Sequence, residues 1–168
     1  MKAVKMLIHA ITLDPESNSP ILILKEEKGE RSLPIWIGLL EATAIATEME
    51  KLSFARPMTH DLAVNLLKAA GMKLLSIAIT EIKDNTYYAE ISIERDGTIV
   101  KVDSRPSDAV ALALRADADI YVNEEVLKSA APADQAPSVL SGDRKEKDQD
   151  KWNKILEELD PDAFKYKM

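Results

Sequence analysis

The sequence predicts an α+β protein, with helices packed on a mixed, largely antiparallel sheet and a helical tail at the C-terminus. Three consecutive β-rich runs are joined by Asp84-Asn85 and Asp96-Gly97, which are dipeptides typical of hairpin turns. The helical segments do not alternate regularly with strands, as they would in a doubly wound parallel sheet. A mixed, largely antiparallel sheet with helices packed on it therefore fits the order of elements best.

The first strands are expected at 3–13 and 20–26, because both runs are β-rich and a segment of Pro, Asn and Ser separates them. A third strand is expected at 32–37, where Gly38 ends the run. From 39 to 52 the apolar residues recur at helical spacing in an Ala-rich segment, which predicts the first helix.

The second helix is expected at 60–70, with Thr59 as its N-cap and Gly71 as the glycine just after its end. The remaining elements are expected in this order: strands at 73–83, 86–95 and 98–103, a helix from 107 to about 115, a strand at 120–122 and a short helix at 124–129.

Three regions follow from this reading. Residues 1–130 are expected to form one α+β domain, which is long enough to bury a single hydrophobic core. Residues 131–150 are rich in Pro, Ala and mixed charges, which is typical of a polar linker. In residues 151–168 the apolar side chains Trp152, Ile155 and Leu159 share one helical face, which predicts an amphipathic helix.

Charge and cysteine content exclude several classes of protein. The formal net charge is −7, so non-specific binding to nucleic acid through a broad basic surface is not expected. The absence of cysteine excludes disulfides and thiolate chemistry and is compatible with a reducing compartment. The first residues are too short and too interrupted for a signal peptide or a membrane span, so a cytoplasmic protein without membrane contact is predicted.

Two Arg-Pro dipeptides each stand just before an expected helix, at Arg56-Pro57 and Arg105-Pro106. Proline keeps the preceding residue extended, so each arginine should lie just outside a helix N-terminus, where backbone N–H groups already favour an anion. A guanidinium group at that place matches phosphate. Arg56 and Arg105 are therefore candidate phosphate-binding residues. The alternative is that each arginine pairs with a neighbouring carboxylate and only holds the loop in place.

Acidic residues and one histidine stand near the same helix starts. Glu41, Asp61, Asp103 and Asp108 offer oxygen ligands for a hard divalent cation such as Mg²⁺, and His60 could activate a water. We assign His60, Asp61 and Asp108 as catalytic candidates. The candidate metal ligands are Glu41, Asp103 and Asp108. The alternative is that the acids stabilise helix N-termini, where a carboxylate contributes about 0.3–1 kcal/mol.

Three segments occur in one order along the chain: Leu33-Pro34-Ile35-Trp36-Ile37-Gly38 with Glu41-Ala42, then Arg56-Pro57-Met58-Thr59-His60-Asp61-Leu62, and then residues 102–115 with Asp103-Ser104-Arg105-Pro106-Ser107-Asp108. Together they resemble the signature segments of the bifunctional nuclease family. The resemblance implies a compact α+β fold, homodimers, and the nuclease activity on DNA and RNA that is reported for some members.

Two functions are therefore carried forward. The first is a metal-assisted nuclease that hydrolyses phosphodiester bonds of DNA or RNA. The second is a non-catalytic dimeric binding or regulatory module, in which the same residues join the helix starts to the sheet. The nuclease requires at least two of the named carboxylates and one named arginine to face a common solvent-accessible cleft, with their functional atoms within about 8 Å, the span of a hydrated metal and a phosphate.

Overall fold

The computed structural model describes residues 2–130 of the chain. The predicted linker at 131–150 and the predicted helix at 151–168 lie outside these residues. The described elements follow in this order: β1 (Ala3–Leu13), β2 (Pro20–Glu26), β3 (Ser32–Trp36), α1 (Leu39–Met49), α2 (Thr59–Ala69), β4 (Lys73–Lys83), β5 (Thr86–Arg95), β6 (Thr98–Ser104), α3 (Pro106–Ala116), β7 (Asp119–Asn123) and α4 (Glu124–Ser129).

The strands of the described part form one sheet in the order β3-β2-β1-β7-β4-β5-β6. Neighbouring strands are antiparallel except β4 and β7, so the predicted mixed, largely antiparallel α+β class is confirmed. The two predicted hairpin turns form at Asp84-Asn85 and Asp96-Gly97, where all four residues have positive φ, as type I′ turns require.

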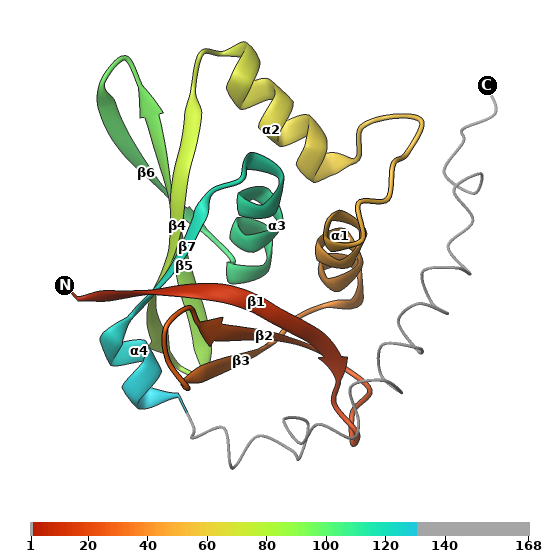
Figure 1. Cartoon of the computed structure of the whole chain (residues 1–168), viewed down its shortest axis with the longest axis vertical. Helices are drawn as coiled ribbons and strands as arrows, with labels where there is room; N and C mark the ends of the chain where they lie inside the picture. Colours follow the sequence, from red (N-terminus) through yellow and green to blue (C-terminus); the bar gives the residue numbers. More distant parts are fainter. Residues whose placement is uncertain (1, 131–168) are drawn as a thin grey trace.

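The sheet changes direction within β1. Its first residues pair with β7 and its later residues pair with β2, and the register shifts at a bulge between Ile8 and Ala10. A bulge bends a strand and increases its twist. In Figure 1, β1–β3 accordingly run across the view, whereas β4–β6 run along its long axis.

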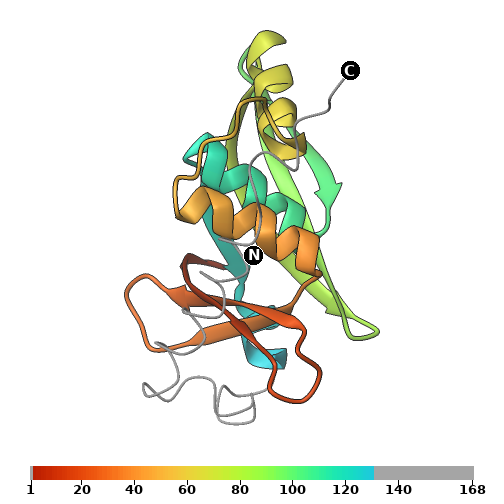
Figure 2. The same cartoon turned by 90° about the vertical axis from the view of Figure 1, so that its right-hand side faces the viewer.

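The hydrophobic core lies between the sheet and α3. Val110 and Ala113 of α3 are fully buried, as are Ile77 and Ile79 of β4. Helices α1 and α2 pack against α3, and Figure 2 shows α1 and α3 side by side on the same face of the sheet. Helix α4 packs against β4 and β7. Because α3 contacts both α1 and α2, the first residues of these three helices come close to one another.

Several helix boundaries differ from those expected, most of them by a single residue. The first helix ends at Met49 rather than at 52, because Lys51 adopts a φ of 53° and the Leu52 N–H turns back to Thr47 O at 2.9 Å. The N-cap of α2 is Met58 and not Thr59, because the Asp61 carboxylate accepts a hydrogen bond from the Met58 N–H at 2.8 Å.

None of the helices within residues 2–130 is long and apolar enough to cross a bilayer.

Candidate functional site

The candidate site is built from the first residues of α1, α2 and α3. Glu41 lies in the first turn of α1, His60 in the first turn of α2, and Asp108 in the first turn of α3. Arg105 is the N-cap residue of α3. These four residues are separated by up to 67 positions in the chain, and contacts among the three helices bring them together.

Arg105 is positioned as the sequence predicts. Its φ of −70° and ψ of 144° are extended, and Pro106 occupies the first helical position, where its missing N–H costs nothing. The guanidinium donates from Nε to Asp108 Oδ2 at 2.7 Å and from Nη1 to Glu41 Oε1 at 2.8 Å. The side chain is still 66% exposed. A guanidinium has five N–H donors, so those not used by the two acids can reach a ligand.

Asp108 connects Arg105 to His60. Its Oδ2 accepts from Arg105, and its Oδ1 lies 3.2 Å from His60 Nε2. Burial alone would raise the pKa of Asp108, but the hydrogen bonds from Arg105 and His60 outweigh it and hold the pKa below its usual value. Asp108 is therefore a carboxylate near neutral pH and can only accept hydrogen bonds.

The tautomer of His60 follows from this contact. Because Asp108 accepts, His60 Nε2 carries the proton, and in the neutral ring Nδ1 then carries the lone pair. Within residues 2–130 the His60 ring forms no hydrogen bond other than that to Asp108. The side chain is 19% exposed. His60 is thus an oriented imidazole with a basic nitrogen still available.

Glu41 lies beside a glycine that makes room for it. A Cβ atom at Gly38 would be 2.1 Å from Glu41 Oε2, which is inside van der Waals contact. The Gly38 backbone has a φ of −74°, so its conformation does not need glycine. A Cβ atom there would instead displace the end of the flexible Glu41 side chain. The carboxylate is folded against the start of α1, where its other oxygen meets Arg105.

Asp61 belongs to a second contact between helices. Its Oδ2 accepts from the Met58 N–H, and its Oδ1 accepts from Arg115 Nε at 2.5 Å. Burial would raise the pKa of Asp61, but the Arg115 and Met58 hydrogen bonds together lower it. Arg115 is nearly buried and also donates to Ala111 O at 3.0 Å. Both Asp61 oxygens are therefore engaged in joining α2 to α3.

Arg115 was not among the predicted site residues. The available signal was its spacing, because Arg115 follows Asp108 by seven positions and residues two turns apart share a helix face. Both ends of this face of α3 contact the start of α2, since Asp108 contacts His60 and Arg115 contacts Asp61.

Besides Asp61, two further predicted site residues form no hydrogen bond or ion pair with Glu41, His60, Arg105 or Asp108. Arg56 is exposed in the segment between α1 and α2, and it forms no hydrogen bond or ion pair with another residue of the described part. Asp103 lies on β6 opposite Glu90 of β5 and likewise has no ion pair within residues 2–130. The distance expectation is thus met by Glu41, Arg105 and Asp108.

The residues give limited support for a bound metal ion. Among residues 2–130, no three His, Cys, Asp or Glu side chains are placed to share a metal ion. The Arg105 guanidinium instead occupies the position between Glu41 and Asp108. A divalent cation such as Mg²⁺ held by Glu41, Asp103 and Asp108 stays a prediction.

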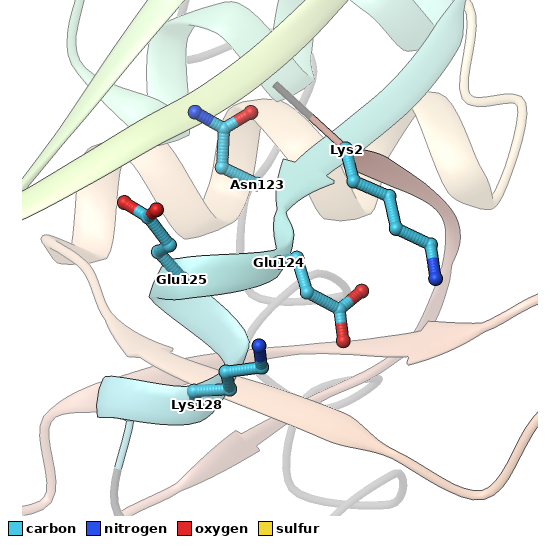
Figure 3. A pocket seen from close by; sticks show the side chains of 5 residues that line it. All are labelled: Lys2, Asn123, Glu124, Glu125 and Lys128. Carbon is cyan, nitrogen blue, oxygen red and sulfur yellow. The ribbon is translucent and has the colours of Figure 1, made fainter.

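A separate surface pocket lies beside α4, and Figure 3 shows the side chains around it. Its Glu124 carboxylate already accepts from Arg31 Nη1 at 2.7 Å. The pocket contains neither a histidine nor any of the predicted site residues. It is lined by Lys2, Asn123, Glu124, Glu125 and Lys128.

Comparison with known families decides the classification. The model of the bifunctional nuclease domain matches residues 22–135, a range that contains every residue of the candidate site. This chain belongs to the bifunctional nuclease domain family. An uncharacterized protein of Mycobacterium tuberculosis is 39% identical over 160 residues, which cover 94% of this chain and 96% of that protein.

Plant members are more distant. Bifunctional nuclease 1 of Arabidopsis thaliana is 27% identical over 109 residues, which cover 62% of this chain and 34% of the plant protein. Bifunctional nuclease 2 of Oryza sativa subsp. japonica is 26% identical over 132 residues, which cover 73% of this chain and 41% of that protein. The chain therefore spans well under half of these plant relatives.

Proposed function

We propose that this chain is a nuclease that hydrolyses phosphodiester bonds of DNA or RNA, and that His60, Asp108 and Arg105 carry the reaction. The main observation in support is the Asp108 carboxylate, which contacts the His60 imidazole with one oxygen and the Arg105 guanidinium with the other. For water to attack a phosphodiester, a base must take its proton and a cation must stabilise the charge on the phosphate. The oriented imidazole and the exposed guanidinium are groups of these two kinds. Membership of the bifunctional nuclease domain family favours the same activity.

His60 acts as the general base in this proposal. Its Nδ1 takes a proton from water while the water oxygen bonds to phosphorus, and the bond from phosphorus to the leaving ester oxygen breaks. The leaving oxygen then takes up a proton from solvent. Asp108 holds the ring in the required tautomer and stabilises the imidazolium that forms, as the aspartate of a catalytic triad does.

Arg105 binds the phosphate. Asp108 and Glu41 raise the pKa of its guanidinium, so the group stays charged, and most of its side chain is exposed to solvent. A guanidinium can donate two parallel hydrogen bonds to phosphate oxygens. Glu41 fixes the group from the opposite side, and this limits the conformations that binding has to select.

The charge of the cluster indicates that a further cation is needed. Glu41 and Asp108 outnumber Arg105 by one charge while His60 is neutral, so a phosphate would meet a slightly negative site. Arg56 is a candidate for this role because it is exposed and has no ion pair within residues 2–130. A divalent cation is the other candidate, but within residues 2–130 the Glu41, Asp103 and Asp108 carboxylates are not placed to share one.

The non-catalytic alternative has its own support. The contacts of Asp61 and Asp108 join α2 to α3, and the contact of Glu41 with Arg105 joins α1 to α3. The same residues could therefore serve only the fold of a binding or regulatory module. Only a measurement of cleavage separates the two functions.

We therefore expect purified full-length protein to cleave labelled single-stranded DNA or RNA, and Asp108→Asn to reduce the rate by about 100-fold or more, the contribution of general acid-base catalysis. The matched control is Asp96→Asn, which makes the same change in the exposed turn between β5 and β6. Circular dichroism and thermal unfolding check that both variants fold.

Equal cleavage by wild type and Asp108→Asn would point to a contaminating enzyme or another site and would refute the proposal. No cleavage of either nucleic acid by the wild type, with Mg²⁺ present, would favour the binding module. Adding a chelator tests the cation separately. Loss of cleavage that Mg²⁺ restores supports the metal prediction, and unchanged cleavage leaves Arg56 as the additional cation.

A further inference from the structure

Strand β6 is an exposed edge of the sheet. It pairs with β5 only, and no helix of the described part packs extensively against it. Its residues from Thr98 to Asp103 are all exposed, and Figure 1 shows the β5–β6 hairpin at the margin of the molecule. An edge strand presents unpaired backbone N–H and C=O groups to any other strand that can approach.

The side chains of β6 extend the face that carries the core. Val102 pairs with Ile91, and Val100 pairs with Ile93, so these residues share one face of the sheet. Ile91 is 5% exposed, whereas Val100 is 51% and Val102 is 42% exposed. The apolar face of the sheet thus continues beyond the helices and ends uncovered at β6.

The two edges of the sheet differ in their protection. The opposite edge strand, β3, contains Pro34, which lacks the N–H that a further strand would need. Strand β6 has no proline, and its pairing with β5 has no bulge. Its only charged residues are Lys101 and Asp103.

Charge complementarity identifies the occupant of this edge. Asp103 lies opposite Glu90, and two acids in directly opposed positions repel each other. Lys101 donates to Glu90 at 2.8 Å, whereas Asp103 has no cation partner within residues 2–130. A second copy of β6 can supply that cation, because it brings another Lys101.

The register of such a pair can be derived. The Asp96-Gly97 turn joins Arg95 and Thr98 as a two-residue hairpin, so Thr98 and every second residue after it bond to β5. Lys101 and Asp103 therefore present their backbone groups to the open edge. When two copies pair antiparallel with Val102 opposite the partner's Val102, each Lys101 lies opposite the partner's Asp103. A register centred on Lys101 or on Asp103 would instead place like charges together.

We propose that two copies of this chain form a symmetric dimer through β6, with Val102 at the two-fold axis and Lys101 paired with the partner's Asp103. The sheets of the two copies become continuous, and the exposed valines are covered. A contact of one strand is smaller than the standard interface of about 1,600 Å², so the dimer should dissociate on dilution. This inference does not depend on the proposed nuclease activity, and it uses Asp103 at the interface.

Charge reversal tests the pairing. Lys101→Glu makes both charged positions of β6 acidic, and Asp103→Lys makes both basic, so each variant alone should be monomeric in sedimentation equilibrium. An equimolar mixture of the two should dimerise, because every opposed pair is then attractive. Asp96→Lys, the same charge change in the neighbouring turn, should dimerise like the wild type.

A single cysteine tests the register in a chain that has none of its own. In a non-hydrogen-bonded antiparallel pair the opposed Cα atoms are about 4.5 Å apart, which a disulfide can span. Val102→Cys should therefore form a covalent dimer on mild oxidation. Val100→Cys, on the same face but opposite the partner's Ser104, should form far less.

Either of two results would overturn the proposal. In the first, the wild type stays monomeric at every concentration and the Val102→Cys variant does not crosslink. This is the result expected if β6 is covered by residues 131–168 or is not covered at all. The other is a wild-type dimer whose dissociation constant is unchanged by Lys101→Glu and Asp103→Lys, which would place the interface elsewhere.

Discussion

At the scale of single residues, the absence of a side chain at Gly38 leaves room for the Glu41 carboxylate that contacts Arg105. A Cβ atom there would be 2.1 Å from Glu41 Oε2. The same relation occurs at Gly29, where a Cβ would be 2.1 Å from Glu26 Oε2, and Glu26 in turn pairs with Arg31. The two glycines thus allow the same experiment at the candidate site and away from it.

We expect Gly38→Ala to lower nuclease activity several-fold without destabilising the fold. The extended φ of −74° suits alanine, and replacing glycine at a compatible position adds about 0.4–1 kcal/mol of stability. Gly38 is also the N-cap of α1, where alanine is less favourable than glycine, so the two effects on stability offset each other. Glu41 must nevertheless turn away and loosen its contact with Arg105. Cleavage assays and thermal unfolding measure both effects. Gly29→Ala should leave cleavage unchanged, and equal rates for all three proteins would show that the Glu41 position is unimportant.

At the scale of elements, the sequence predicts those that depend on local signals. The expected bounds of β4, β5 and β6 agree with the observed ones within one residue. The reason is that each hairpin turn is determined by a dipeptide and the residues directly beside it. The end of α1 was missed because Lys51, which shows no glycine or proline signal, adopts the left-handed conformation. The Asp61 contact with Arg115 could not be predicted, because it joins residues 54 positions apart.

We expect Asp61→Asn to destabilise the protein by about 1.5–3 kcal/mol at neutral pH, the usual contribution of a hydrogen bond to a charged group. The pKa of Asp61 is lowered in the folded state. Its contribution is therefore present above the unfolded pKa of about 3.9 and lost as pH falls through the folded value. Urea unfolding at several pH values measures this.

The difference in stability between wild type and Asp61→Asn should be constant from neutral pH down to about pH 5 and should shrink below about pH 4. The control, Asp96→Asn, alters a side chain that is 90% exposed and should change stability little at any pH. A difference that persists undiminished in acid would mean that the charge of Asp61 does not stabilise the contact between α2 and α3.

At the scale of the whole molecule, the candidate site exists only because three helix starts meet. The sequence could indicate the residue types and place each at a helix start, since Arg-Pro dipeptides and first-turn acids are local signals. It could not show which of them converge. Four of them converge because α3 packs against both α1 and α2, namely Glu41, His60, Arg105 and Asp108. Arg56 and Asp103 do not contact these four residues.

The proposed nuclease rests most directly on His60 as a base oriented by Asp108, and chemical rescue measures that role. The His60→Ala variant removes the imidazole at a partly exposed position, into which free imidazole can diffuse. Its cleavage of labelled single-stranded nucleic acid should be lost and should return in proportion to added imidazole. Undiminished cleavage by the folded variant, or no return at any imidazole concentration, would contradict the proposed role.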